Sequence, residues 1–309
     1  MAIIFPGSGN TVTIHDDLII GSGDPSVIDT IYGDSSGTLS TGSAGNDVIF
    51  GVDGFDNLRG DAAILDGASD TVFARGGNDI INVGASGTGS NDARGDADTI
   101  QGFGAGGNDL LLGSEHSDEL RGDARTMQDS AHGGADWLWG AGGNDSLTGD
   151  ARDMKGASVG GDDHLFGGDG DDTLRGDARM MSDTATGGRD WLDGGKGNDV
   201  LWGDAENMAA GNQGGNDVLT GGQGHDTFEF AGHFGHDLVL DLDQGDHGPT
   251  GEQLVFKNTS AVGESFDAHG NLVLAVDDGT PAHILSTVTL LDVHQALAGA
   301  QSGTDFIVG

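Results

Sequence analysis

Aspartates recur at regular positions along this chain, each closing a glycine-rich turn. The clearest copy is Gly-Gly-Asp-Gly-Asp-Asp-Thr-Leu-Arg at residues 167–175, and the phrase returns at 194–202 and 221–229. Carboxylate and backbone carbonyl oxygens are the ligands that Ca²⁺ prefers, usually six to eight of them at roughly 2.3–2.6 Å. Glycine adopts positive φ freely, so such a turn can curl with its carbonyls facing one point. The nine-residue phrase therefore favours calcium chemistry.

The aspartates that end these turns are the candidate calcium ligands. Those that close short turns are Asp47, Asp56, Asp79, Asp109, Asp118, Asp145, Asp172, Asp199 and Asp226, and Asp169, inside one such turn, is a further candidate. Those that close longer turns are Asp136, Asp163, Asp190 and Asp217, with Asp70 and Asp98 upstream. An isolated Asp of this kind commonly only hydrogen-bonds its own turn. The number of copies in register favours metal binding over that alternative.

A longer period is superimposed on the nine-residue one. The tripeptide Gly-Asp-Ala begins at residues 122, 149, 176 and 203, one copy every 27 residues, and a methionine follows each copy in step. The aspartates of these tripeptides are Asp123, Asp150, Asp177 and Asp204. Two interpretations remain open for them. They are either additional calcium ligands or N-caps of a short helical turn such as 177–181, whose methionine packs the loop against the core.

Each turn is followed by three residues with an apolar side chain in the middle, which is the pattern of a short strand with one inward residue. The predicted inward residues are Leu138, Leu147, Leu165, Leu174, Leu192, Leu201, Leu219 and Phe228. One 27-residue unit is predicted to form two strands joined by a short and a long turn. Stacking the units gives an all-β fold with two parallel sheets face to face.

The nonapeptide resembles the hemolysin-type calcium-binding (RTX) repeat of proteins exported by type I secretion, here in an elongated 27-residue variant. The resemblance implies a right-handed parallel β-roll with several Ca²⁺ ions between stacked turns, each sharing carboxylates from successive coils. It also implies a secreted, extracellular protein that folds when it meets calcium outside the cell. The end of the chain, 305–308, resembles the C-terminal signal read by type I secretion machinery, although Gly309 departs from that pattern.

The chain divides into three predicted regions. Residues 42–229 carry the repeats, residues 1–41 are expected to form an N-terminal cap, and residues 230–309 a C-terminal flank that closes the roll. Solenoid ends need such covers because their last coil would otherwise expose its apolar face.

Composition limits the classes of partner. The chain has 60 glycines in 309 residues, no cysteine, and 51 acidic against 12 basic residues, for a formal charge of −39. This charge argues against nucleic acid or an anionic membrane as a partner, and divalent cations are its natural compensation. No apolar stretch is long enough for a transmembrane helix, and the first residues lack the pattern of a Sec signal peptide.

No catalytic constellation is apparent, so we expect the protein not to be an enzyme. HExxH is absent, and the two GxSxG matches at 33–37 and 156–160 lack the strand–turn–helix context of a nucleophile elbow. A secreted hydrolase would need its active site in the flank or in the long turns.

An aromatic cluster suggests a binding role instead. Trp137, Trp139, Phe166 and Trp191 are expected on one outer face. Either the flank, the long turns or a second copy covers this face, or it is an adhesin-like platform for polysaccharide.

Overall fold

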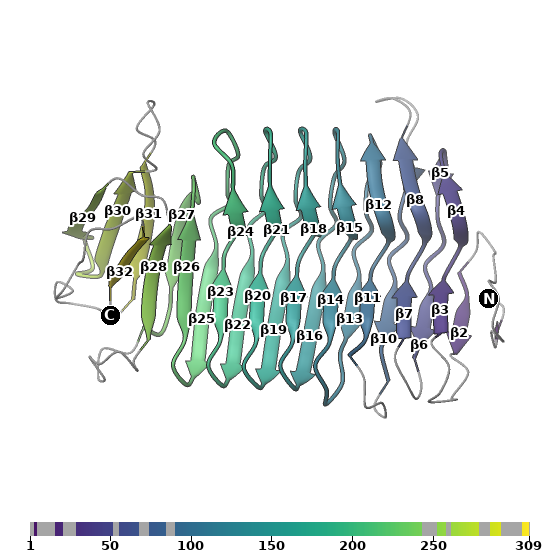
Figure 1. Cartoon of the computed structure of the whole chain (residues 1–309), viewed down its shortest axis with the longest axis horizontal. Helices are drawn as coiled ribbons and strands as arrows, with labels where there is room; N and C mark the ends of the chain where they lie inside the picture. Colours follow the sequence, from purple (N-terminus) through teal and green to yellow (C-terminus); the bar gives the residue numbers. More distant parts are fainter. Residues whose placement is uncertain are drawn as a thin grey trace.

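The computed structural model describes residues 3–4, 16–20, 29–51, 56–67, 74–84, 90–242, 252–257, 261–277, 285–291 and 305–308. In these residues the protein is an all-β parallel solenoid of about eight coils, without helix (Figure 1). The described part of the chain accordingly holds no helix of the length and apolar character needed to cross a lipid bilayer.

One coil consists of three strands. In the best-defined part of the array these are β16 (Trp137–Gly142), β17 (Ser146–Thr148) and β18 (Ala151–Met154), and each belongs to a different sheet. The prediction of two strands per coil was therefore wrong, because the predicted long turn contains the third strand. After β18 the chain turns back to the first sheet through a segment that includes an isolated bridge at Val159.

The strands of successive coils stack into three long sheets. Sheet A contains β1 (Ile3–Ile4), β2 (Leu18–Ile20), β6 (Val48–Phe50), β10 (Ile80–Asn82), β13 (Leu110–Leu112), β16, β19 (His164–Asp169), β22 (Trp191–Lys196), β25 (Val218–Gln223) and β27 (His236–Val239). Sheet B contains β3 (Asp29–Tyr32), β7 (Asp56–Arg59), β11 (Asp92–Arg94), β14 (Glu119–Arg121), β17, β20 (Thr173–Arg175), β23 (Val200–Trp202), β26 (Thr227–Ala231) and β28 (Gln253–Lys257). Sheet C contains β4 (Ser35–Leu39), β8 (Ala62–Gly67), β12 (Ala97–Gly102), β15 (Ala124–Met127), β18, β21 (Ala178–Met181) and β24 (Ala205–Met208). A small fourth sheet pairs β5 (Gly42–Ser43) with β9 (Ala74–Arg75).

The register of the stack places equivalent residues of neighbouring coils side by side. Leu138 of β16 pairs with Leu165 of β19, which pairs with Leu192 of β22. All eight predicted inward residues are fully buried in the core between sheets A and B. A second core lies under sheet C and contains alanines and the buried Met127, Met154 and Met181.

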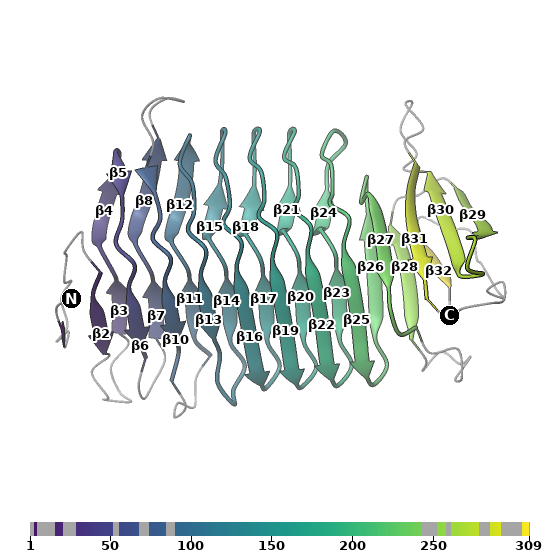
Figure 2. The ribbon, with the colours of Figure 1, turned by 180° about the vertical axis from the view of Figure 1, so that it is seen from behind.

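The ends of the array differ from the predicted region boundaries. Within residues 1–41, β2, β3 and β4 already pair in parallel with β6, β7 and β8, so the first coil starts before the repeats do. At the other end, β27 and β28 continue sheets A and B past residue 229. Beyond them β29 (Ala261–Phe266), β30 (Leu272–Asp277) and β31 (Leu285–Leu290) extend sheet A, and β32 (Asp305–Val308) runs antiparallel to β28 (Figure 2).

Candidate metal centre

A row of buried aspartates lies at the start of the strands of sheet A. It includes Asp47, Asp79, Asp109, Asp136, Asp163, Asp190 and Asp217, each immediately before a strand, and Asp237, the second residue of β27. The backbone N–H of each of the first seven donates to Oδ1 of the next member, as Asp136 does to Asp163 at 2.8 Å. Oδ2 of every member is buried and has no hydrogen-bond partner.

A second row stands before the strands of sheet C. Its members are Asp34, Asp61, Asp96, Asp123, Asp150, Asp177 and Asp204, all buried. Each accepts the backbone N–H of a glycine further along its own coil; Gly134 donates to Oδ1 of Asp123 at 2.9 Å and Gly161 to Oδ1 of Asp150 at 2.7 Å. Their second oxygens are buried and unpartnered in Asp61, Asp123, Asp150 and Asp177.

The structure of this second row bears on the two interpretations of the Gly-Asp-Ala aspartates. Residues 178–181 form strand β21 and not a helical turn, so the N-cap interpretation was wrong. The expectation that the methionine packs the segment against the core is confirmed at Met127, Met154 and Met181.

The two rows converge inside the coil most closely at the two ends of the array. Carboxylate oxygens of Asp204, Asp217 and Asp237 all lie within 4.8 Å of one another, and the same holds for Asp34, Asp47 and Asp61. Backbone carbonyls line the same space. We call this space, bounded by the sheet-A and sheet-C rows of aspartates, the interior column.

Glycines keep the interior column open. A Cβ atom at residue 149 would overlap both the carbonyl oxygen of Gly176 and Oδ2 of Asp163. A Cβ at residue 176 would meet the carbonyl of Gly203 and Oδ2 of Asp190 in the same way. Glycine is therefore required in each Gly-Asp-Ala because oxygen atoms occupy the place of its side chain.

A second column runs along the short turns between sheets A and B. It contains Asp118, Asp145, Asp172, Asp199 and Asp226, which are also buried. Asp145 N–H donates to Oδ1 of Asp172 at 2.8 Å, and the pattern repeats along the row. Oδ2 is unpartnered in all of them except Asp118, where it accepts from Ser114. We call this set the turn column.

Burial disfavours the ionised form of these carboxylates. It raises the pKa of Asp145 and of Asp199 to about 7, although the backbone hydrogen bond that each carboxylate accepts lowers its pKa. In the interior column burial raises the pKa of Asp163 well above its ordinary value, and the charge on Asp123 acts in the same direction. Buried carboxylates without a compensating charge cost several kcal/mol each, on the order of 3–5 when a partner is missing.

The donor set fits calcium. It consists of carboxylate and carbonyl oxygens, which are hard ligands, and includes neither the thiolates nor the imidazoles that transition metals select. The unpartnered Oδ2 atoms supply the acceptors that a cation needs. One divalent ion between two coils would compensate two of these charges.

Most of the predicted ligands lie in one of the two columns. The interior column holds Asp47, Asp79, Asp109, Asp136, Asp163, Asp190, Asp217, Asp123, Asp150, Asp177 and Asp204. The turn column holds Asp118, Asp145, Asp172, Asp199 and Asp226.

The remaining predicted ligands lie elsewhere. Asp98 belongs to β12 and accepts hydrogen bonds from Arg59 and Arg94, because its side chain points out of sheet C. Asp169 is largely exposed and forms an ion pair with Lys196 at 2.6 Å. Asp56 is the first residue of β7, and its side chain, like the whole of Asp70, lies outside the described residues.

Four members of the interior column were not predicted. Asp61 and Asp96 sit in Gly-Asp-Ala tripeptides that begin at residues 60 and 95, so the tripeptide signal was present upstream of the regular array. Asp34 follows glycine in the related Gly-Asp-Ser, and Asp237 ends a Gly-x-Asp. The steps from Asp61 to Asp96 (35 residues) and from Asp217 to Asp237 (20 residues) depart from the 27-residue period, whereas Asp96 lies one full period before Asp123 and was missed although it fits.

Comparison with known families gives an independent result. The RTX calcium-binding nonapeptide repeat matches more than half of the chain, at residues 41–63, 66–86, 92–124, 130–151, 159–178, 184–207 and 213–237. No curated protein matches the chain.

Proposed function

Because the chain belongs to the family of RTX calcium-binding nonapeptide repeat proteins, we propose that it is a secreted calcium-binding protein with a non-enzymatic structural or interaction role. Calcium filling the interior and turn columns drives its folding. The observation that carries this proposal is the row of buried, unpartnered Oδ2 atoms in a chain of net charge −39.

The energetics support a calcium-dependent fold. One coil alone buries little apolar surface, and stacking coils brings buried carboxylates into the same column. Without cations their mutual repulsion opposes stacking, as the raised pKa of Asp136 illustrates, where burial acts first and the charges of Asp123 and Asp109 add to it. Calcium binding to the stacked form alone shifts the equilibrium towards folding by mass action.

We also propose export through a type I secretion machinery, which the same physics supports. Calcium sites of extracellular modules have dissociation constants of roughly 10⁻⁴–10⁻³ M, so they stay empty in the cytosol and fill outside. The empty chain remains open enough to thread a channel, and the filled chain is trapped in its folded form.

The experiment is a calcium titration of chelated full-length protein followed by far-UV circular dichroism, with magnesium as control. We expect a cooperative gain of β-structure with calcium only. A spectrum that is already that of a β-protein in chelator and does not respond to calcium would refute the proposal.

A second candidate function is carbohydrate binding at the aromatic face formed by Trp137, Trp139, Phe166 and Trp191. The three tryptophans are 40–43 % exposed, so neither the described flank nor the described turns cover them. The ring of Trp139 stacks on Phe166 with centroids 4.9 Å apart. Flat exposed rings of this kind suit stacking against sugar rings.

The alternatives for the aromatic face are separable. Tryptophan fluorescence of the calcium-loaded protein should change with a neutral polysaccharide and lose that response in Trp139→Ala. Self-association would instead appear as a dimer in light scattering, disrupted by the same variant. Neither result would disturb calcium-induced folding.

We also propose that the protein has no enzymatic activity. Ser158, the central residue of one GxSxG match, is fully buried, which supports a structural role for that segment. A hydrolase would be revealed by an activity that one substitution abolishes while calcium-induced folding persists.

A further inference from the structure

Arginine is concentrated in one place on this acidic protein. Six of its twelve basic residues line a single cavity of about 470 Å³ along the edge between sheets B and C. They are Arg94, Arg121, Arg125, Arg152, Arg175 and Arg179. Only two acids, Asp92 and Glu119, share the lining, so this surface is locally cationic. We call it the arginine groove.

Two rows of arginine form the groove. On sheet B, Arg121 of β14 is in register with Thr148 of β17, which is in register with Arg175 of β20. Thr148 lines the cavity and is shorter than the arginines at the equivalent positions of the neighbouring coils. The second residues of three sheet-C strands supply the other row: Arg125, Arg152 and Arg179.

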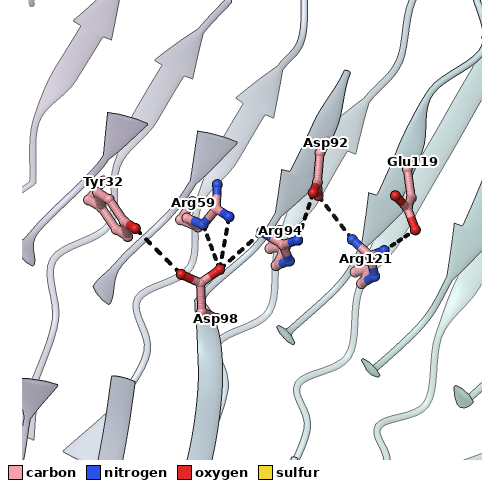
Figure 3. Close-up of polar contacts among 7 residues, drawn as sticks. All are labelled: Tyr32, Arg59, Asp92, Arg94, Asp98, Glu119 and Arg121. Carbon is pink, nitrogen blue, oxygen red and sulfur yellow. Dashed lines mark hydrogen bonds and ion pairs between the residues drawn. The ribbon is translucent and has the colours of Figure 1, made fainter. Parts of the chain in front are cut away.

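At its N-terminal end the groove continues into arginines that already have acidic partners (Figure 3). Asp98 forms ion pairs with Arg59 at 2.8 Å and with Arg94 at 3.1 Å. Asp92 pairs with Arg121 at 2.9 Å. These contacts fix the guanidinium groups in place and neutralise much of their charge.

The middle of the groove differs from its two ends in how its arginines are paired with acids. At the C-terminal side Glu206 pairs with Arg175 at 2.9 Å and approaches Arg179 only to 3.7 Å. Within the described residues, no ion pair involves Arg125 or Arg152. The unneutralised charge of the groove is therefore centred on β15 and β18, beside the space over Thr148.

We propose that the arginine groove binds a short segment of an acidic glycan, through its carboxylate or sulfate groups. Guanidinium groups present planar pairs of donors that match such oxyanions. The hydroxyls of Ser146 and Thr148 line the same cavity and offer hydrogen bonds to sugar hydroxyls. A cavity of this volume is within the usual range of ligand sites, about 300–1,000 Å³.

The net charge selects against longer polyanions. Away from the groove the surface of a chain of formal charge −39 repels a nucleic acid, which carries one phosphate per nucleotide. A short glycan segment places its charges in the groove and needs no contact with the rest of the surface. The lining of the groove comes from sheets B and C, whereas the aromatic face belongs to sheet A.

The test is isothermal titration calorimetry of the calcium-saturated full-length protein. The probes are a tetrauronate, a sulfated tetrasaccharide and a neutral tetrasaccharide. We expect heat with at least one acidic probe and none with the neutral probe, and the responding probe identifies carboxylate or sulfate as the recognised group. Absence of binding by both acidic probes, or equal binding of the neutral one, would overturn the proposal.

Two variants locate the site. Arg152→Gln removes an unpaired guanidinium and should weaken binding at least tenfold. Arg189→Gln is the matched control, because it removes the same charge from an exposed residue outside the groove and should leave the affinity unchanged. An equal loss in both variants would show attraction by overall charge alone and would contradict a defined site.

Filling the cavity separates shape from charge. Thr148→Arg restores the residue type found at the equivalent position of neighbouring coils and adds one positive charge. If the space over Thr148 holds the ligand, binding is lost despite the added charge. Tighter binding would refute the cavity as the site. Circular dichroism in calcium checks that each variant folds, and an oligothymidylate competing as well as the acidic glycan would likewise refute the proposal.

Discussion

Oδ1 of Asp163 accepts the backbone N–H of Asp136 at 2.8 Å, while Oδ2 of the same carboxylate is buried without a partner. One oxygen of the side chain thus joins two coils, and the other faces the interior column. The same division recurs in each full coil of the array. A single residue type therefore performs two tasks, a structural hydrogen bond and the supply of a ligand oxygen.

Asp163→Asn should separate these tasks. The amide can keep the hydrogen bond from Asp136 through its oxygen, but it removes the negative charge and replaces one ligand oxygen by NH₂. We expect fewer calcium ions bound per chain and a calcium midpoint for folding raised at least several-fold, measured by calorimetry and circular dichroism.

The adjacent Asp162→Asn is the matched control for that substitution. Asp162 is exposed and accepts the backbone N–H of Arg189 at 2.9 Å. Its calcium stoichiometry should equal that of the unmodified protein. An equal effect of both substitutions would mean that calcium responds to overall charge and not to the interior column.

Gly176→Ala should disrupt the interior column sterically. The added Cβ would overlap the carbonyl oxygen of Gly203 and Oδ2 of Asp190. Overpacking of this kind costs typically about 1–3 kcal/mol of unfolding free energy, and here it also displaces ligand oxygens. Thermal unfolding in saturating calcium measures the loss.

Gly263→Ala provides the comparison for the glycine substitution. Gly263 lies in β29, and the nearest atom to an added Cβ is the carbonyl oxygen of Ala275 at 3.9 Å. Its melting temperature should change little. A Gly176→Ala protein with the same melting temperature as Gly263→Ala would show that the oxygen-lined space is not needed for stability.

The stability of the calcium-free protein should fall as pH rises. Burial raises the pKa of Asp145 and Asp199 from 3.8 to about 7 and that of Asp47 to about 8. Between pH 4 and 7, roughly, the folded form then binds more protons than the unfolded form, so acidification favours folding. Circular dichroism without calcium should show more β-structure at pH 4.5 than at pH 7.5.

Calcium should reverse the direction of this pH dependence. Protons compete with the metal for the same carboxylates, so the calcium midpoint for folding should rise as pH falls. A calcium-free protein that gains structure with increasing pH would contradict the assignment of these carboxylates to buried positions.

The third strand of each coil can be tested with neighbouring methionines. Met181 is buried in the core under sheet C, whereas Met180 is 46 % exposed on the same strand. Met181→Ala should lower the unfolding free energy in calcium by about 2–5 kcal/mol. Met180→Ala should change it by less than about 0.5 kcal/mol. Similar losses of unfolding free energy in both variants would contradict the placement of Met181 in the core and of Met180 at the surface.

The part of the fold that follows strand alternation could be predicted from sequence. Leu165 and Leu174 each stand in the middle of a three-residue strand, and both are inward and buried. The third strand escaped prediction because its buried residues are the first and the fourth, as in Ala124 and Met127. That spacing departs from the two-residue period of a pleated strand.

The candidate site was predicted in its residue types but not in its arrangement. The aspartates before sheet A and those of the Gly-Asp-Ala tripeptides were separate sets in the sequence. The third strand, here β24 of sheet C, lies between Asp204 and Asp217 in the chain, and carboxylate oxygens of these two residues lie within 4.8 Å of each other. A two-strand coil would have kept these rows apart, so the interior column depends on the element that was missed.

The aspartate hydrogen bonds also give the solenoid a polarity. Asp136 donates to Asp163 and Asp163 to Asp190, and Asp145 likewise donates to Asp172, so each acceptor belongs to the coil on the C-terminal side. Removing coils from the N-terminal end leaves every remaining amide of these rows satisfied. Removing them from the C-terminal end leaves one buried backbone amide in each column without its hydrogen-bond acceptor. The aspartate hydrogen bonds of the stack therefore all run in one direction, and each coil depends on the following coil for the acceptors of its buried amides.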